Sequence, residues 1–286
     1  MDGIVIVDKP QDWTSQDVVS KLRGVFKTRR IGHGGTLDPM ATGVLPVFVG
    51  RATRGVEFFE HAEKTYEAVL RLGLHTDTED ITGTVLQEKE VNITESQFLS
   101  ALAHFRGEIQ QIPPMYSAIK VGGQKLCDLA RKGREVERQP RTITIYRLEC
   151  LEFSGHTARL LVHCSKGTYI RTLCKDIGEH LGCGGCMESL RRVTAGEYTI
   201  EKSVPLQTLI ESEDPGAYLL PVDSMFQAYP AVTLTEKQEK CCRNGVAFTT
   251  NLAEGTYRVY AQNGEFLALS HMVDGKLTTI KSFWAV

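Results

Sequence analysis

The stretch on which the fold and the site depend reads RIGHGGTLDPMATG, residues 30–43. It holds four glycines and one carboxylate, Asp38, which directly precedes Pro39. Glycine is used where the backbone takes a positive φ or comes close to a ligand. Proline disfavours the α region for the residue before it, so we expect extended backbone at Asp38. The stretch predicts a loop that holds one acidic side chain in a defined direction and leaves room for a ligand.

A surface turn is the simplest alternative, because glycine and Asp-Pro are ordinary turn residues. The run that follows, residues 44–50, is almost wholly apolar and predicts a buried strand. Loops that carry function are usually held by a rigid scaffold of this kind.

The chain has 286 residues, enough for one large domain and a small one, and its net charge is only −2. No apolar run approaches the roughly 18 residues of a membrane span. The N-terminus lacks the features of a signal peptide, so we expect a cytoplasmic protein. Residues 21–30 nevertheless carry five basic side chains and no acid, and residues 120–141 carry seven against three acids. Such stretches fit a phosphate-binding surface or solvated helix faces, and charge alone does not decide between them.

Eight cysteines are scattered along the chain. The single CxxC, Cys183 to Cys186, has no second closely spaced pair, which a structural zinc site would need. We expect reduced structural thiols and no metal. The acidic stretch 74–84 reads as a hairpin tip, although by itself it resembles a calcium or magnesium loop. It lacks the ligand spacing of an EF-hand.

Apolar periodicity and end signals divide the rest into alternating strands and helices. Strands are expected over residues 3–7, 66–72, 142–153 and 158–164, and helices from 14 or 15, from 94, over 170–181 and over 235–243. Asn-Gly and Asp-Gly pairs at 263–264 and 274–275 predict hairpins near the C-terminus. The pattern indicates an α+β protein with a small β-rich module from about residue 229.

The motif around Asp38 closely resembles the catalytic motif of the bacterial TruB family of tRNA pseudouridine synthases. Further segments resemble that family in the family's order along nearly the whole chain. They are VDKP at 7–10 with Thr14-Ser15, KTY at 64–66, TDTED at 76–80, QIPPMYSAIK at 111–120, GTYIR at 167–171 and LRR at 190–192. One departure is Asp12, where the family often has glycine.

The resemblance implies a pseudouridine-synthase fold, in which helices and loops flank a mixed, mainly antiparallel central sheet. It implies a catalytic domain over 1–228, with an RNA-clamping insertion at about 106–140. Residues 229–286 would form a PUA-like RNA-binding domain.

The resemblance also implies the site. Asp38 would be the catalytic residue, Arg171 would pair with it and keep it ionised, and Tyr66 would stack on the base. Lys9 would brace the loop, and the motif histidine would occupy space vacated in the RNA. The residues expected to bind substrate are His33, Lys9, Lys64, Asp80, Tyr169 and Leu190.

The implied reaction converts the uridine at position 55, in the TΨC loop of tRNA, to pseudouridine by base flipping and covalent catalysis by an aspartate. The family implies no cofactor and no guide RNA, and we expect a monomer. Two alternatives stay open: the guide-RNA-dependent relatives of archaea and eukaryotes, and an RNA chaperone without chemistry. The intact set of Asp38, Tyr66 and Arg171 argues against chaperoning as the sole role.

Overall fold

The computed structural model describes residues 1–284 and is a mixed α+β protein. Its internal contacts divide the chain into two compact units. The first holds Met1–Pro39, Leu45–Glu60 and the chain from Glu201 onward, and the second holds Met40–Val44 and His61–Ile200. The expected domain boundary at 228 stays a prediction. Within residues 1–284, no helix has the length and apolar character needed to cross a bilayer.

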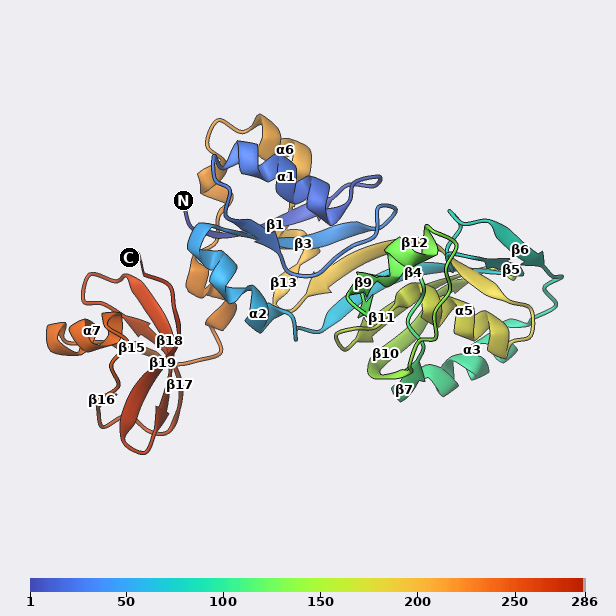
Figure 1. Ribbon diagram of the computed structural model, residues 1–286. Coiled ribbons are helices and arrows are strands. Elements are labelled where there is room, and N and C mark those ends of the chain that lie inside the picture. The colour runs from blue at the N-terminus through green and yellow to red at the C-terminus, as the bar shows by residue number, and fades with distance from the viewer. Residues whose placement is uncertain (285–286) are drawn as a thin grey trace. The chain divides into compact units, whose positions relative to one another are not determined.

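The N-terminal part of the first unit is a strand layer covered by helices. Strand β1 (Gly3–Lys9) is parallel to β14 (Val204–Pro205), and β2 (Ile31–His33) is antiparallel to β3 (Thr42–Val49). Helix α1 (Ser15–Val25) begins at the capping box of Thr14 and Asp17, which satisfies two free backbone N–H groups. It contacts α6 (Leu206–Glu211), which also contacts β1 (Figure 1). Helices η1 (Gly50–Gly55) and α2 (Val56–Phe59) follow β3.

Asp12 lies in the loop between β1 and α1 with φ 65°, a left-handed conformation that glycine adopts without a steric penalty. This is the position at which the resembled family often has glycine. Aspartate tolerates this region better than most residues other than glycine.

The C-terminal part of the first unit is a five-stranded sheet in the order β15-β17-β18-β19-β16. Asp274 and Gly275 both have positive φ, 50° and 72°, as a two-residue hairpin turn requires. Helix α7 (Glu236–Arg243) begins at a capping box of Thr235 and Gln238. The strands are β15 (Ala231–Thr233), β16 (Phe248–Thr249), β17 (Gly255–Tyr260), β18 (Phe266–Val273) and β19 (Lys276–Ser282).

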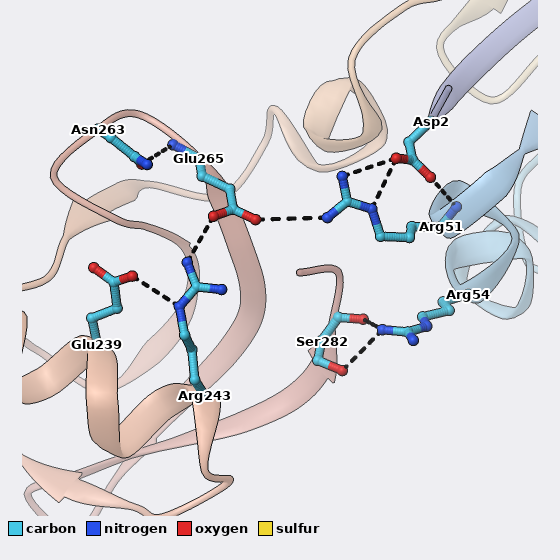
Figure 2. Close-up of polar contacts among 8 residues, drawn as sticks. All are labelled: Asp2, Arg51, Arg54, Glu239, Arg243, Asn263, Glu265 and Ser282. Carbon is cyan, nitrogen blue, oxygen red and sulfur yellow. Dashed lines mark hydrogen bonds and ion pairs between the residues drawn. The ribbon is translucent and has the colours of Figure 1, made fainter. Parts of the chain in front are cut away.

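Polar contacts join this C-terminal sheet to the N-terminal part of the same unit. Arg51 pairs with Asp2 at 2.9 Å and with Glu265 at 3.6 Å, and Glu265 accepts a hydrogen bond from Arg243 (Figure 2). Arg54 donates to the Ser282 carbonyl. Burial acts to raise the pKa of Asp2, but the hydrogen bonds from Arg51 outweigh it and the pKa is lowered. An apolar cluster of Phe226, Leu269 and Phe283, with Phe58 against it, adds to this attachment.

The second unit is built on strands in the order β12-β4-β11-β10-β7, with β13 (Tyr198–Thr199) beside β12. Helices α3 (Glu95–Leu102) and α5 (Ile170–His180) pack against one face of this sheet (Figure 1). Alternate residues of β4 are therefore buried, which is the pattern that predicted the strand. The strands are β12 (Gly185–Ala195), β4 (Lys64–Leu72), β11 (Thr157–Cys164), β10 (Arg141–Phe153) and β7 (Gly107–Gln111).

Residues 107–111 of the expected insertion form β7, which belongs to the sheet and pairs with β10. The segment that leaves the sheet therefore begins after Gln111. That segment contains a small hairpin of β8 (Lys120–Val121) and β9 (Gln124–Lys125), the one-turn helix α4 (Leu126–Ala130) and irregular chain. The acidic stretch expected at a hairpin tip joins β5 (Leu74–Thr76) to β6 (Val85–Glu88), and η2 (Ala103–Phe105) follows α3.

The expected fold class is confirmed. The predicted helices and strands are present, and the sheet is mixed and mainly antiparallel, with a separate β-rich C-terminal sheet. Short helical turns η3 (Ile200–Lys202), η4 (Pro215–Tyr218) and η5 (Val222–Phe226) connect the main elements.

Candidate active site

Asp38 lies, half-buried, in the loop between β2 and β3, and both of its neighbours are fixed. The Leu37 N–H donates to Ser15 Oγ at 2.8 Å, and Ser15 Oγ lies 3.1 Å from the Leu37 carbonyl oxygen. The Pro39 carbonyl accepts hydrogen bonds from the Asp12 N–H at 2.8 Å and from Lys9 Nζ at 3.1 Å. The backbone on each side of the aspartate is thus tied to residues 9–15, which limits the directions in which the carboxylate can point.

Lys9 is completely buried. Its ammonium donates to the carbonyls of Pro10 at 2.8 Å, Trp13 at 2.6 Å and Pro39 at 3.1 Å. A lysine ammonium has three donors and must lose its hydration when buried, so three carbonyl acceptors suit it. These contacts make Lys9 a brace of the Asp38 loop. We also expected it to bind substrate, but its side chain has no exposed surface in this structure.

His33 ends β2 at the start of the same loop, opposite Val47 of β3, and is half-buried. Gly34 follows and donates its N–H to the Pro46 carbonyl at 2.9 Å. A Cβ at Gly34 would collide with the rings of Phe48 and Phe59. The glycine is therefore required by close packing of the loop on the core.

Residues 42–44, at the start of β3, are held by the LRR segment of β12, which belongs to the same second unit. Arg191 donates to the Thr42 hydroxyl at 3.2 Å, and the buried Arg192 donates from Nε to the Val44 carbonyl at 2.6 Å. Gly43 has φ +99°, and a Cβ there would overlap the Arg192 backbone. Sequence reasoning assigned no role to these two arginines, because their partners lie about 150 residues earlier in the chain.

Arg171 is the second residue of α5, and its side chain is only 7% exposed. Nη1 donates to the Thr78 carbonyl at 3.1 Å, Nη2 donates to the Tyr116 carbonyl at 2.8 Å, and Nε lies 3.8 Å from Asp80 Oδ2. A buried guanidinium needs such partners to offset its lost hydration. An arginine at a helix start is normally exposed, so its burial marks a special position.

Asp80 is also buried, and its second oxygen, Oδ1, accepts three hydrogen bonds from its own turn. The donors are the Thr82 N–H at 3.0 Å, the Thr82 hydroxyl at 2.6 Å and the Thr78 hydroxyl at 2.9 Å. These bonds orient the carboxylate toward Arg171. They account for the two threonines that flank Asp80 in this turn.

Tyr66 and Leu190 lie on adjacent strands, β4 and β12, and both are buried. Leu190 is opposite Ala68, and Tyr66 is opposite Arg192, so the two side chains are diagonal neighbours on one face. Lys64, two residues before Tyr66, is buried and donates to the Ala62 carbonyl.

Tyr169 precedes α5, and its main chain is held by the side-chain amide of Gln111 at the end of β7. Gln111 belongs to the QIPP segment, but sequence reasoning gave it no function of its own. No local signal in the sequence marks it, because its partner lies 58 residues away.

The candidate residues thus form two groups. The first unit holds Lys9, His33 and Asp38 around one braced loop. The second unit joins Asp80 to Arg171, and Tyr66 to Leu190. The pairing of Asp38 with Arg171 involves residues of different units and stays a prediction.

The fold of the chain is similar to that of single chains in two solved complexes. The matched chain in the crystal structure of a Cbf5-Nop10-Gar1 complex is 26% identical, with a TM-score of 0.74 over 99% of this chain and 85% of that one. The matched chain of an H/ACA RNP bound to a substrate RNA containing 2'-deoxyuridine is 24% identical, with the same TM-score and the same shares covered. The fold is that of the pseudouridine synthases.

Residues 23–170 match the N-terminal domain of the TruB family pseudouridylate synthases, and residues 171–227 match the tRNA pseudouridylate synthase B C-terminal domain. The tRNA pseudouridine synthase B of Clostridium kluyveri is 41% identical over 99% of this chain and 100% of its own length. That of Dechloromonas aromatica is 46% identical over 92% of this chain and 89% of its own. The chain belongs to the TruB family of pseudouridylate synthases, which confirms the resemblance that the motifs indicated.

Proposed function

We propose that this protein is a tRNA pseudouridine synthase that isomerises the uridine at position 55, in the TΨC loop, to pseudouridine. The glycosidic bond from C1′ to N1 breaks, a bond from C1′ to C5 forms, C5 loses its proton and N1 gains one. The reaction is an isomerisation and consumes no co-substrate. The observation that carries the proposal is a single aspartate, Asp38, in a loop braced on both sides, within a chain of the TruB family.

Asp38 acts as the nucleophile and attacks either C6 of the uracil or C1′ of the ribose, so that one difficult step becomes two easier ones. A nucleophilic carboxylate must be ionised, and a nearby guanidinium favours the ionised form. Arg171 supplies that charge. Asp80 and the carbonyls of Thr78 and Tyr116 hold the guanidinium in place.

The target base cannot react while stacked in the RNA, so it is flipped into the pocket. Tyr66 stacks on the extruded uracil, and Leu190 and Tyr169 line its pocket. His33 fills the space that the base leaves in the RNA loop. Lys64 is buried at the start of β4, two residues before Tyr66. It supports that end of the strand by donating a hydrogen bond to the Ala62 carbonyl.

Exposed cations support an RNA partner. All five basic residues of the stretch 21–30 are solvent-exposed, which suits contacts with phosphate oxygens. The segment after β7 clamps the RNA, and the C-terminal sheet acts as a PUA-like RNA-binding module. We further propose that the enzyme works as a cytoplasmic monomer on the tRNA TΨC stem-loop, without a guide RNA.

The test is release of tritium from an unmodified tRNA transcript that carries the label at uridine C5. Wild type and Asp38→Ala are compared without guide RNA or added metal, and a transcript with the TΨC-loop uridine replaced serves as substrate control. We expect one label released per tRNA by wild type alone, and none from the control transcript. Binding without release by wild type would refute the proposal in favour of a chaperone or a guide-dependent enzyme.

A further inference from the structure

Gln111 is a buried residue on an otherwise accessible strand. It ends β7, an edge strand whose other four residues are exposed or half-buried, whereas only 1% of Gln111 is exposed. Burying an amide without hydrogen bonds is unfavourable, so the position needs a reason.

The buried amide of Gln111 forms hydrogen bonds with the peptide backbone at Tyr169. Gln111 Oε1 accepts from the Tyr169 N–H at 2.8 Å, and Gln111 Nε2 donates to the Tyr169 carbonyl at 3.0 Å. Tyr169 is the residue on which α5 begins, and no side chain of its own segment caps that helix end. The Tyr169 carbonyl also accepts the first helical bond, from the Leu173 N–H at 3.0 Å. One side chain thus holds both polar groups of the residue from which α5 starts.

The same segment also holds the tip of Arg171. That arginine lies two residues after Tyr169, and its Nη2 donates to the carbonyl of Tyr116, five residues beyond Gln111. The backbone at the root of Arg171 and the guanidinium at its end are therefore both fixed by residues 111–116. Asp80 and the Thr78 carbonyl, which belong to a different hairpin, contact the same guanidinium.

We propose that Gln111 is a positioning residue for the isomerisation, acting through the placement of the Arg171 side chain. The inference rests on the proposed function. Without the Gln111 amide, the first turn of α5 loses its anchor and the guanidinium loses its fixed root. Misplacement of a catalytic group by about 1 Å can lower a rate by about 100-fold.

Two variants and one matched control isolate this role. Gln111→Met keeps the length of the side chain and removes both hydrogen bonds. Gln111→Glu keeps an acceptor for the Tyr169 N–H but sets a carboxylate against the Tyr169 carbonyl. Gln110→Met makes the same chemical change one residue earlier, where the exposed amide donates to the Thr142 hydroxyl at 2.8 Å.

The experiment measures the single-turnover rate of label release, together with the Kd for tRNA and the circular dichroism spectrum. We expect Gln111→Met to slow release by about 10- to 100-fold with a Kd within about twofold of wild type, while Gln110→Met matches wild type. Because Gln111 places a side chain of the reaction and does not itself contact the RNA in this proposal, the loss falls on the single-turnover rate and leaves the Kd for tRNA nearly unchanged.

A rate loss matched by an equal loss of tRNA affinity or by a changed circular dichroism spectrum, or no rate loss, overturns the inference while wild-type release keeps the proposed function intact. If Gln111→Met does not fold, the same two outcomes are read from Gln111→Glu. An inactive wild type would overturn the proposed function and the inference together.

Discussion

Replacement of Ser15 by alanine tests whether the braces of the loop control both its stability and the reaction. Ser15 is 2% exposed, and its hydroxyl serves both the N–H and the carbonyl of Leu37, the residue before Asp38. Ser15→Ala leaves the buried Leu37 N–H without this acceptor, which typically destabilises by about 1–3 kcal/mol. Alanine is a good helix former at the first position of α1, so the helix itself should not oppose the change.

Both tryptophans of the chain, Trp13 and Trp284, belong to the first unit, so urea unfolding followed by fluorescence reports on the unit that holds the loop. We expect Ser15→Ala to lower the free energy of unfolding by about 2 kcal/mol. Single-turnover label release should slow by about tenfold or more, because the carboxylate is less well oriented.

Ser20→Ala is the matched control, since Ser20 is an exposed serine of the same helix and should tolerate the change within about 0.5 kcal/mol. If Ser15→Ala unfolded like wild type and released label at the full rate, the hydroxyl would not brace the loop. If it were destabilised but fully active, orientation of Asp38 would not depend on that brace.

Three further predictions follow from other contacts. Asp80→Asn should slow single-turnover label release by about tenfold or more, because a neutral amide no longer offsets the buried charge of Arg171. An unchanged rate would show that the charge of Asp80 is dispensable. Gly43→Ala should lower the thermal unfolding temperature, because φ is +99° and the new methyl group meets the Arg192 backbone, whereas the exposed Gly24→Ala, with open space around it, should not. Burial raises the pKa of Asp176 to about 6, whereas in the unfolded state this carboxyl loses its proton near pH 4. Between these two values the folded state binds more protons than the unfolded state, so the free energy of unfolding falls as the pH rises from about 4 to about 6. Asp176→Asn should therefore raise the unfolding temperature at pH 8 and do so less at pH 4.5; an equal gain at both pH values would contradict the assigned cause.

The sequence was sufficient for the local structure. Capping residues predicted the starts of α1, at Thr14 or Ser15, and of α3, at Thr94, and alternation predicted β4. Asn-Gly and Asp-Gly predicted the C-terminal hairpins. These signals work because caps, turns and periodic burial depend on residues that are close in the chain. The motif around Asp38 indicated the family for a similar reason, since its residues are contiguous.

The sequence could not indicate which distant groups form hydrogen bonds with each buried polar side chain. Lys9 looked like a possible substrate contact, whereas the fold buries it against the loop that holds Asp38. Residues 107–111 looked like the start of the insertion, whereas they form β7 and pair with β10 in the sheet.

The amino-acid sequence by itself determined the elements, the family motifs and the choice of Asp38 as the central residue. Tertiary structure decided how Arg171 is held, because its partners Thr78, Asp80 and Tyr116 come from two other segments. It also decided the place of Gln111, whose partner lies 58 residues along the chain. A buried charge or amide is stabilised only by partners that folding brings within hydrogen-bond distance, and no local pattern in the sequence records which ones they are.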